Sequence, residues 1–163
     1  MMTAGPDAVA LMHFYEGCKL RAYPDPATGG DPWTIGYGDT GPDVVRGLVI
    51  TQAEADARFL RRLAKEFEPG VRSALKREPT QRQFDAMVSL AYNIGIGNFK
   101  LSTLVLMFNR GDAKAASAQF RRWNKAAGRP MLGLTRRRVA ESIVFDGYPA
   151  ALAISKAGLI TKV

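Results

Sequence analysis

The sequence predicts an α+β fold that is mostly α, with a small antiparallel β-sheet lobe and a larger helical lobe. Two observations lead to this prediction: residues 20–50 are rich in Pro and Gly and contain short β-compatible segments, whereas the chain from residue 51 shows helical periodicity. The chain has 163 residues, 47% of them hydrophobic and 23% charged. That composition is typical of a folded globular protein, and the length suffices for one domain with two lobes.

The N-terminal lobe, residues 8–50, is expected to contain one helix and a sheet of two or three strands. The helix opens at Pro6-Asp7 and ends at Gly17, because its apolar residues recur at helical spacing in between. Turns rich in Pro, Gly and Asp separate the candidate strands, which are Leu20–Tyr23, Trp33–Tyr37 and Val49–Ile50.

The helical lobe is expected over residues 51–146. Capping boxes start two helices, one at Thr51 with Glu54 and one at Thr80 with Gln83, and Pro69-Gly70 should kink or interrupt the first. Shorter helices are expected over residues 102–108 and from 112 through 123, and a last helix after residues 133–135. Residues 147–163 form a C-terminal extension to which the sequence assigns no role, so we expect a single domain over 1–163.

The balance of charge indicates a polyanionic partner. Lys and Arg number 23 against 15 Asp and Glu, a net charge of +8, which suits nucleic acid, an anionic membrane surface or an acidic polymer such as a bacterial wall. The single cysteine, Cys18, excludes an internal disulfide, and the single histidine, His13, excludes zinc sites that need several imidazoles. A surface position on its helix is the favoured interpretation of His13.

The sequence also shows neither a membrane-spanning segment nor the features of a signal peptide. No apolar run approaches the ~20 residues of a membrane span, and no Lys or Arg precedes Lys19, so the basic region of a signal peptide is lacking. We therefore expect a chain made in the cytoplasm, with no signal peptide, no signal anchor and no stable membrane insertion.

Two carboxylates and a hydroxyl form the candidate catalytic group. Glu16 lies on the last turn of the first helix, where the helix dipole favours a protonated carboxyl of the kind a glycosidase uses as general acid. Asp25 follows nine residues later in a turn, and Thr34 lies on the next strand. The plainer interpretation is that Glu16 is a solvated surface residue and Asp25 a structural turn residue.

A resemblance adds to this interpretation. The segment FYEGCKLRAYPD at residues 14–25 and the motif WTIGYG at 33–38 resemble the signature of the phage-type lysozymes, or endolysins. The similarity covers roughly residues 8–146. Its further matching segments are Thr51–Asp56, Gln83–Gly95, Phe99–Leu104, Phe120–Trp123 and Gly133–Glu141.

The resemblance implies a lysozyme-like fold with the active-site cleft between the lobes, and catalysis by a Glu, an Asp and a Thr. These match Glu16, Asp25 and Thr34, but eight residues separate the last two here, against five in shorter members of the family. Asp31 is therefore an alternative base. Asp25 is favoured because its spacing from Glu16 is intact and a hairpin tip absorbs insertions without moving its stems.

Other residues match family positions more weakly. Arg137, within a run of three arginines, corresponds to a residue that forms an ion pair with the catalytic Glu, although a solvated basic face is an equal alternative for its neighbours. Thr40, Tyr92 and Ser102 correspond to positions that line the saccharide site, whereas packing and capping are the simpler interpretation of the last two. No metal or organic cofactor is implied.

The function that the resemblance implies is hydrolysis of the β-1,4 bond between N-acetylmuramic acid and N-acetylglucosamine in peptidoglycan, with inversion, by a monomeric endolysin that lyses the host cell. Such a protein waits in the host cytoplasm and reaches the periplasm and cell wall through a pore made by a separate holin. Alternatives are a lytic transglycosylase acting on the same bond, a non-catalytic wall-binding module and a basic DNA-binding helical protein. The last is disfavoured because the sequence offers no recognition helix, so nucleic acid is not expected as a partner.

Overall fold

The computed structural model describes residues 1–25 and 28–163, and within them helices predominate over short antiparallel strands. The mostly helical α+β fold predicted from the sequence is thus confirmed. The chain forms two compact units, one of residues 13–65 and one of residues 1–12 with 66–163. Among the described residues, no helix is both long enough and apolar enough to cross a membrane.

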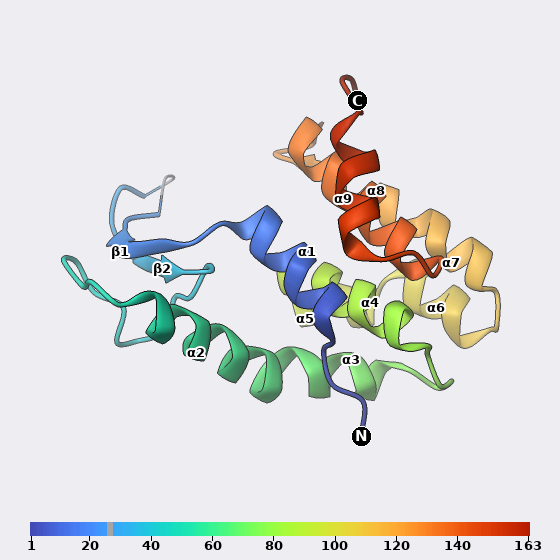
Figure 1. The fold of residues 1–163 in the computed structure, drawn as a ribbon, viewed down its shortest axis with the longest axis horizontal. Helices are drawn as coiled ribbons and strands as arrows, with labels where there is room; N and C mark the ends of the chain where they lie inside the picture. Colours follow the sequence, from blue (N-terminus) through green and yellow to red (C-terminus); the bar gives the residue numbers. More distant parts are fainter. Residues whose placement is uncertain (26–27) are drawn as a thin grey trace. The chain divides into compact units, whose positions relative to one another are not determined.

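The unit of residues 13–65 contains the end of α1 (Pro6–Glu16), strands β1 (Lys19–Tyr23) and β2 (Thr34–Gly36), and α2 (Gln52–Arg62) (Figure 1). The two strands pair antiparallel, with Lys19 opposite Gly36 and Tyr23 opposite Thr34, and the register shifts between these pairs. Residues 48–50 run along β1 as the predicted third segment, since the Ile50 N–H donates to the Leu20 carbonyl at 2.9 Å.

Strand β2 is shorter than the expected Trp33–Tyr37. It ends at Gly36 because Gly36 (φ 59°) and Gly38 (φ 85°) are both in the left-handed region, which glycine adopts without the steric cost of a Cβ. The N–H groups of Ile35 and Asp39 each donate to the other's carbonyl at 2.9 Å. The chain therefore reverses through a tight turn of Gly36, Tyr37 and Gly38, referred to below as the glycine turn.

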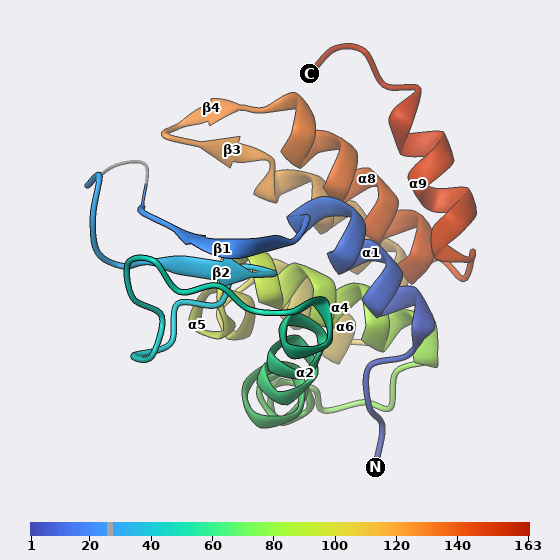
Figure 2. The ribbon, with the colours of Figure 1, turned by 60° about the vertical axis from the view of Figure 1, so that its left-hand side comes forward.

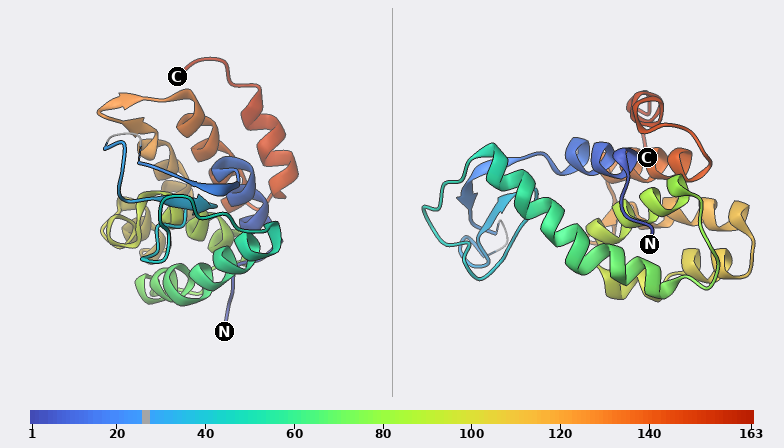
Figure 3. Two further views of the ribbon diagram at one scale, coloured as in Figure 1. Left: turned by 90° about the vertical axis from the view of Figure 1, so that its left-hand side faces the viewer. Right: turned by 60° about the horizontal axis from the view of Figure 1, so that its bottom comes forward.

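Helix α2 begins as predicted at Thr51, whose side chain accepts a hydrogen bond from the Glu54 N–H at 3.2 Å. The Glu54 carboxylate binds Arg58 rather than completing the reciprocal half of a capping box. The helix packs against β2 (Figure 3). Ala55 Cβ is the nearest atom to a Cβ built on Gly36. The unit therefore extends to residue 65, beyond residue 50 where the sequence pattern changes.

The interruption predicted at Pro69-Gly70 takes the form of a π-helical segment, Leu63–Phe67, directly before α3 (Glu68–Ala74). Pro69 then lies in the first turn of α3, a position at which proline is common. Gly70 packs closely on α5, since a Cβ there would lie 2.5 Å from Ile96 Cδ1.

The second unit is built around α4 (Gln81–Ile94), which starts with the predicted capping box at Thr80. Residues 84–92 are all buried, and α4 packs against α8 (Leu132–Phe145). The remaining elements before α8 are short. They are α5 (Ile96–Lys100), α6 (Thr103–Asn109), α7 (Ala113–Gln119), a 3-10 helix (Phe120–Trp123), β3 (Lys125–Ala126) and β4 (Arg129–Pro130).

The C-terminal part differs from expectation in two ways. The predicted last helix starts at Leu132 rather than after Thr135, and a further helix, α9 (Ala150–Gly158), follows it. Helix α9 packs on α8 (Figure 2). It buries three alanines. Asp7 links the first turn of α9 to α4. One of its carboxylate oxygens accepts from the Ala150 N–H at 2.7 Å, and the other accepts from Arg82 at 2.9 Å.

Candidate active site

Glu16 is the last residue of α1, and its side chain is half-buried. Gly17 (φ 65°) follows it, donates its N–H to the His13 carbonyl at 3.2 Å and turns the chain toward β1. The carboxylate lies beside the glycine turn, because a Cβ built on Gly38 would lie 3.9 Å from Glu16 Oε2. The absence of a side chain at Gly38 thus leaves space next to the carboxylate.

His13, one helical turn before Glu16, packs against the same turn. Its ring stacks on Tyr37 with centroids 4.1 Å apart and planes 5° apart, and it also contacts Phe59 at 4.7 Å. His13 is therefore half-buried against two rings rather than fully solvated, and its Nε2 is buried without a hydrogen-bond partner among the described residues. Burial lowers the pKa of His13, while the nearby charge of Asp56 opposes that shift.

Tyr37 is fixed from its other end by α2. Its hydroxyl donates to Asp56 Oδ1 at 3.1 Å and accepts from Gln52 Nε2 at 3.0 Å, and Gln52 also donates to Asp56 at 2.8 Å. Burial, followed by the hydrogen bond to Asp56, raises the pKa of Tyr37 to about 12. The hydroxyl therefore remains a donor throughout the neutral pH range.

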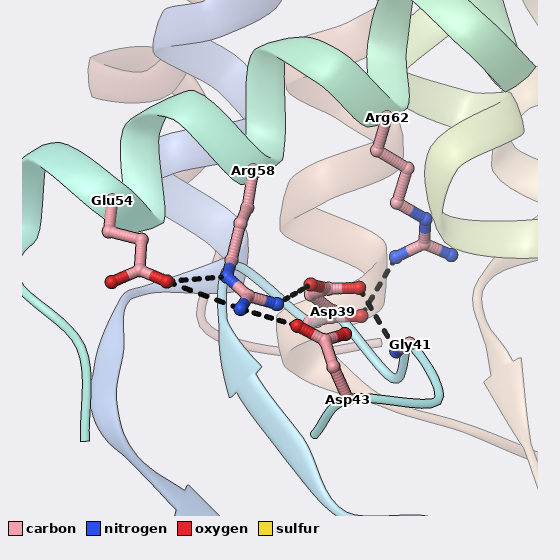
Figure 4. Close-up of polar contacts among 7 residues, drawn as sticks. Asp39, Gly41, Asp43, Glu54, Arg58 and Arg62 are labelled. Carbon is pink, nitrogen blue, oxygen red and sulfur yellow. Dashed lines mark hydrogen bonds and ion pairs between the residues drawn. The ribbon is translucent and has the colours of Figure 1, made fainter. Parts of the chain in front are cut away.

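Two arginines of α2 bind the chain just after Tyr37 (Figure 4). Arg62 Nη1 donates to the Gly38 carbonyl at 2.8 Å. Arg58 lies between Asp39 at 3.1 Å, Asp43 at 2.6 Å and Glu54 at 3.2 Å. The hydrogen bond from Arg58 holds the pKa of Asp43 below its usual range.

Asp25 lies just past the end of β1, and its side chain is half-buried. The loop that follows closes on it, since its N–H donates to the Gly30 carbonyl at 3.0 Å and its carbonyl accepts from the Gly29 N–H at 2.8 Å. Its Oδ1 also accepts from the Thr28 N–H at 3.2 Å. Asp31, the alternative base, is exposed, and Thr28 Oγ1 donates to its carbonyl at 2.8 Å.

Thr34 opens β2 opposite Tyr23, two residues before Asp25, so the strand pairing brings Thr34 and Asp25 to the same end of the hairpin. Glu16 lies toward the other end, near the glycine turn. Thr40 is exposed in the loop that follows that turn. All four residues belong to the unit of residues 13–65.

The other candidates belong to the second unit. Tyr92 is buried on α4 with its ring 4.8 Å from Phe67, and Ser102 caps α6 by accepting from the Val105 N–H at 3.3 Å. Both residues thus have the packing and capping contacts that the simpler interpretation expected. A role for either in saccharide binding stays a prediction.

The arginine run on α8 is largely buried. Arg137 donates to Glu141 at 3.1 Å and to the Ser89 carbonyl at 3.3 Å. Arg138 is fully buried and pairs with Glu141 at 3.0 Å and Asn93 at 3.0 Å. A solvated basic face is therefore wrong for Arg138, because it is buried and contacts Glu141 and Asn93 inside the unit. A pair between Arg137 and Glu16 stays a prediction.

Sequence reasoning missed the residues that support the glycine turn. The sequence pattern places Tyr37 in the WTIGYG motif and at the end of a candidate strand, and it does not single out Gln52, Asp56 or Arg62. Gln52 and Asp56 are spaced i, i+4 on α2, which was the available signal for these two; Arg62, six residues after Asp56, does not share that spacing. Within residues 1–25 and 28–163, no group of three His, Cys, Asp or Glu side chains is arranged to hold a metal ion.

Chemically, the unit of residues 13–65 offers one half-buried carboxyl at a helix end and a second carboxyl beyond a short strand, with a hydroxyl near the second. A helical protein with this arrangement on a small hairpin has the lysozyme-like fold. The family model described as phage lysozyme matches residues 13–141, and the chain belongs to that family.

Individual relatives agree with this membership. The chain is 43% identical over 138 residues to the endolysin of Bacillus phage PZA, a match that covers 85% of this chain and 53% of that protein. It is 41% identical over 142 residues to the endolysin of Acyrthosiphon pisum secondary endosymbiont phage 1, covering 85% of this chain and 94% of that one. The chain thus spans about half the length of the Bacillus phage endolysins that it matches.

A solved structure shows the same fold. The endolysin from Escherichia coli O157:H7 phage FAHEc1 superposes with a TM-score of 0.79 at 33% identity, covering 91% of this chain and 97% of that chain.

The contact between Gly38 and Glu16 predicts the effect of Gly38→Ala. The left-handed backbone should cost about 1–2 kcal/mol of unfolding free energy once a Cβ is present, and the new methyl group should lie against the Glu16 carboxylate. Gly47→Ala is the matched control, because Gly47 has φ 86° but no atom near a Cβ. Denaturant unfolding should show similar losses for both variants, whereas an assay of cell-wall clearing should show a loss of activity only for Gly38→Ala. Equal activity in the two variants would contradict the assigned contact.

The environment of His13 predicts a dependence of stability on pH. The pKa of His13 in the folded protein lies below 6.5, the ordinary pKa of histidine. As the pH falls through 6.5, the unfolded chain therefore binds a proton at this residue that the folded chain does not bind. Stability is then lost down to the folded-state pKa. His13→Phe keeps a ring against Tyr37 and removes this titration.

Unfolding free energies measured at about pH 7.5 and about pH 5 should therefore differ less in His13→Phe than in the unchanged protein. The same difference in both proteins would show that His13 titrates normally.

Proposed function

We propose that this chain is an endolysin that hydrolyses the bond between N-acetylmuramic acid and N-acetylglucosamine in bacterial peptidoglycan. The observation that carries the proposal is the position of Glu16, half-buried at the end of α1 against the glycine turn, in the same unit as Asp25 and Thr34. Membership of the phage lysozyme family supports it, as does the name endolysin of the relatives described above. Residues 1–163 then act as one catalytic domain.

In the proposed mechanism, Glu16 donates a proton to the glycosidic oxygen as the bond to the anomeric carbon breaks. Asp25 accepts a proton from a water molecule that Thr34 orients, and this water attacks the opposite face of the sugar. A single displacement of this kind inverts the anomeric configuration, and it requires carboxyl groups about 6.5–9.5 Å apart. The oxygen of water becomes the new hydroxyl of the muramic acid, so neither metal nor organic cofactor is required.

The loop geometry favours Asp25 over Asp31 as the base. Hydrogen bonds between Asp25 and both Gly29 and Gly30 close the longer loop on itself, so the extra residues fall beyond Asp25 rather than between Glu16 and Asp25. Asp25 is half-buried next to the strand end, whereas Asp31 is exposed. A partly buried carboxylate has fewer conformations to lose when it positions a water molecule.

The weaker candidates have supporting roles in this proposal. Arg137 would form an ion pair with the Glu16 carboxylate, and Thr40, Tyr92 and Ser102 would contact the glycan strand. The net charge of +8 suits an anionic cell wall. We further propose that the protein acts as a monomer, accumulates in the host cytoplasm and reaches the wall through a pore made by a holin.

A lytic transglycosylase is the second candidate, because it cleaves the same bond. It needs only one acid and forms an anhydro-sugar without water, so the presence of both Asp25 and Thr34 favours hydrolysis. Mass spectrometry of the released muropeptides separates the two reactions. A hydrolase gives reducing muramic acid ends that are one water heavier than the anhydro products of a transglycosylase.

Conservative variants of the three acidic residues test the catalytic roles. Glu16→Gln and Asp25→Asn should each lower the rate of clearing of outer-membrane-permeabilised cells by about a hundredfold or more, because each removes a proton-transfer group while keeping its shape. Asp31→Asn, which changes an exposed residue of the same loop, is the matched control and should clear at nearly the original rate.

The result that would overturn the assignment of the base is the reverse order, with Asp31→Asn inactive and Asp25→Asn active. Full activity of a folded Glu16→Gln variant would overturn the proposed function itself, and would leave a non-catalytic wall-binding module as the better description.

A further inference from the structure

The glycine turn contacts the last turn of α1 in two places. The Tyr37 ring stacks on His13, with centroids 4.1 Å apart. The backbone at Gly38 lies beside Glu16 Oε2, since a Cβ there would be 3.9 Å away. Any movement of this turn would therefore change both the packing under the last helical turn and the space around the Glu16 carboxyl.

The turn itself offers few groups by which it can be held. Two of its three residues are glycines in the left-handed region, and these have no side chains with which to anchor it. The two main-chain bonds between Ile35 and Asp39 close the base of the turn, so the groups left within it are the Tyr37 side chain and the main-chain groups of its three residues. Because left-handed glycines are also the most flexible positions of a chain, such a turn keeps one geometry only if those groups are bonded.

Helix α2 binds these groups. The Tyr37 hydroxyl is bonded to both Asp56 and Gln52, at 3.1 and 3.0 Å. The Gly38 carbonyl accepts from Arg62 Nη1 at 2.8 Å. Hydrogen bonds to carboxylate and guanidinium groups are about twice as strong as those between neutral groups, and two of the bonds that hold the turn are of this kind, one to Asp56 and one from Arg62.

We propose that Tyr37, Asp56 and Arg62 are positioning residues for the reaction, which hold the glycine turn against α1 and thereby fix the Glu16 carboxyl relative to the bond that it protonates. This inference rests on the proposed function. Arg58 differs from these residues, because it binds the carboxylates of Asp39 and Asp43 beyond the turn (Figure 4). Its bonds hold the following loop rather than the residues that contact α1.

The test compares two neighbouring arginines of α2. Arg62→Gln removes the bond to the Gly38 carbonyl, whereas Arg61→Gln removes the same charge from an exposed residue. The kcat and KM of each are measured on soluble, uncrosslinked glycan strands of peptidoglycan, at a temperature well below the measured unfolding midpoint of each variant. Under these conditions nearly every molecule is folded, so a loss of stability alone leaves kcat unchanged.

We expect Arg62→Gln to lower kcat by about tenfold to a hundredfold with little change in KM, because a shift of the acid of about 1 Å costs this much in rate. Arg61→Gln should keep the original kcat. Arg62→Lys, which restores a charged donor, should recover part of the loss. Tyr37→Phe, which keeps the ring on His13 and deletes only the hydroxyl, should lower kcat in the same way.

An unchanged kcat in folded Arg62→Gln and Tyr37→Phe would overturn the inference, as would equal losses in Arg62→Gln and Arg61→Gln. Glu16→Gln is measured in the same assay, so that failure of the positioning inference can be distinguished from failure of the proposed function. If Glu16→Gln is inactive and the positioning variants are fully active, this inference alone fails. If Glu16→Gln turns over normally, the proposed function fails.

Discussion

Tyr37 makes the contact on which the geometry of residues 13–65 depends. Its ring stacks on His13 at the end of α1, and its hydroxyl is bonded to Asp56 on α2. The residue itself belongs to the turn that ends β2. One buried side chain therefore joins two helices and the hairpin, and the high pKa of its phenol, about 12, keeps it a neutral donor throughout the neutral pH range.

The two carboxyl groups of the candidate site are supported in different ways. Glu16 is attached to a helix whose last turn is packed against aromatic rings and the glycine turn. Asp25 begins a loop that closes through its own main-chain bonds to Gly29 and Gly30. The long interval between Asp25 and Thr34 therefore begins with a segment that these bonds close on Asp25.

Much of the fold was predictable from local signals. Gly17 follows the end of α1, Thr51 and Thr80 are the N-caps of their helices, and short β-compatible segments predicted the strands of the sheet. The β3–β4 hairpin was missed because its turn, Ala127-Gly128, lacks the usual Asn-Gly or Asp-Gly signal. Helix α9 was missed because it buries only alanines, which give a weak apolar pattern.

The acidic residues of the candidate site were predictable from the sequence, but the residues that hold them in place were not. Glu16 and Asp25 lie in a recognisable motif, whereas the contacts of His13, Arg62 and Arg138 are tertiary. A polar residue that is stacked on a ring, bonded to a carbonyl or paired inside a core has the same local pattern as one on a solvated surface. Only the packing of distant segments distinguishes the two cases.

The central claim is that two carboxyl groups act on opposite faces of one sugar in a single displacement. Proton NMR of the reaction at early times tests it most directly, because it reads the anomeric configuration of the new reducing end before mutarotation. The account predicts that the first product formed from the β-linked strand has the α configuration. A first product with the β configuration would contradict it.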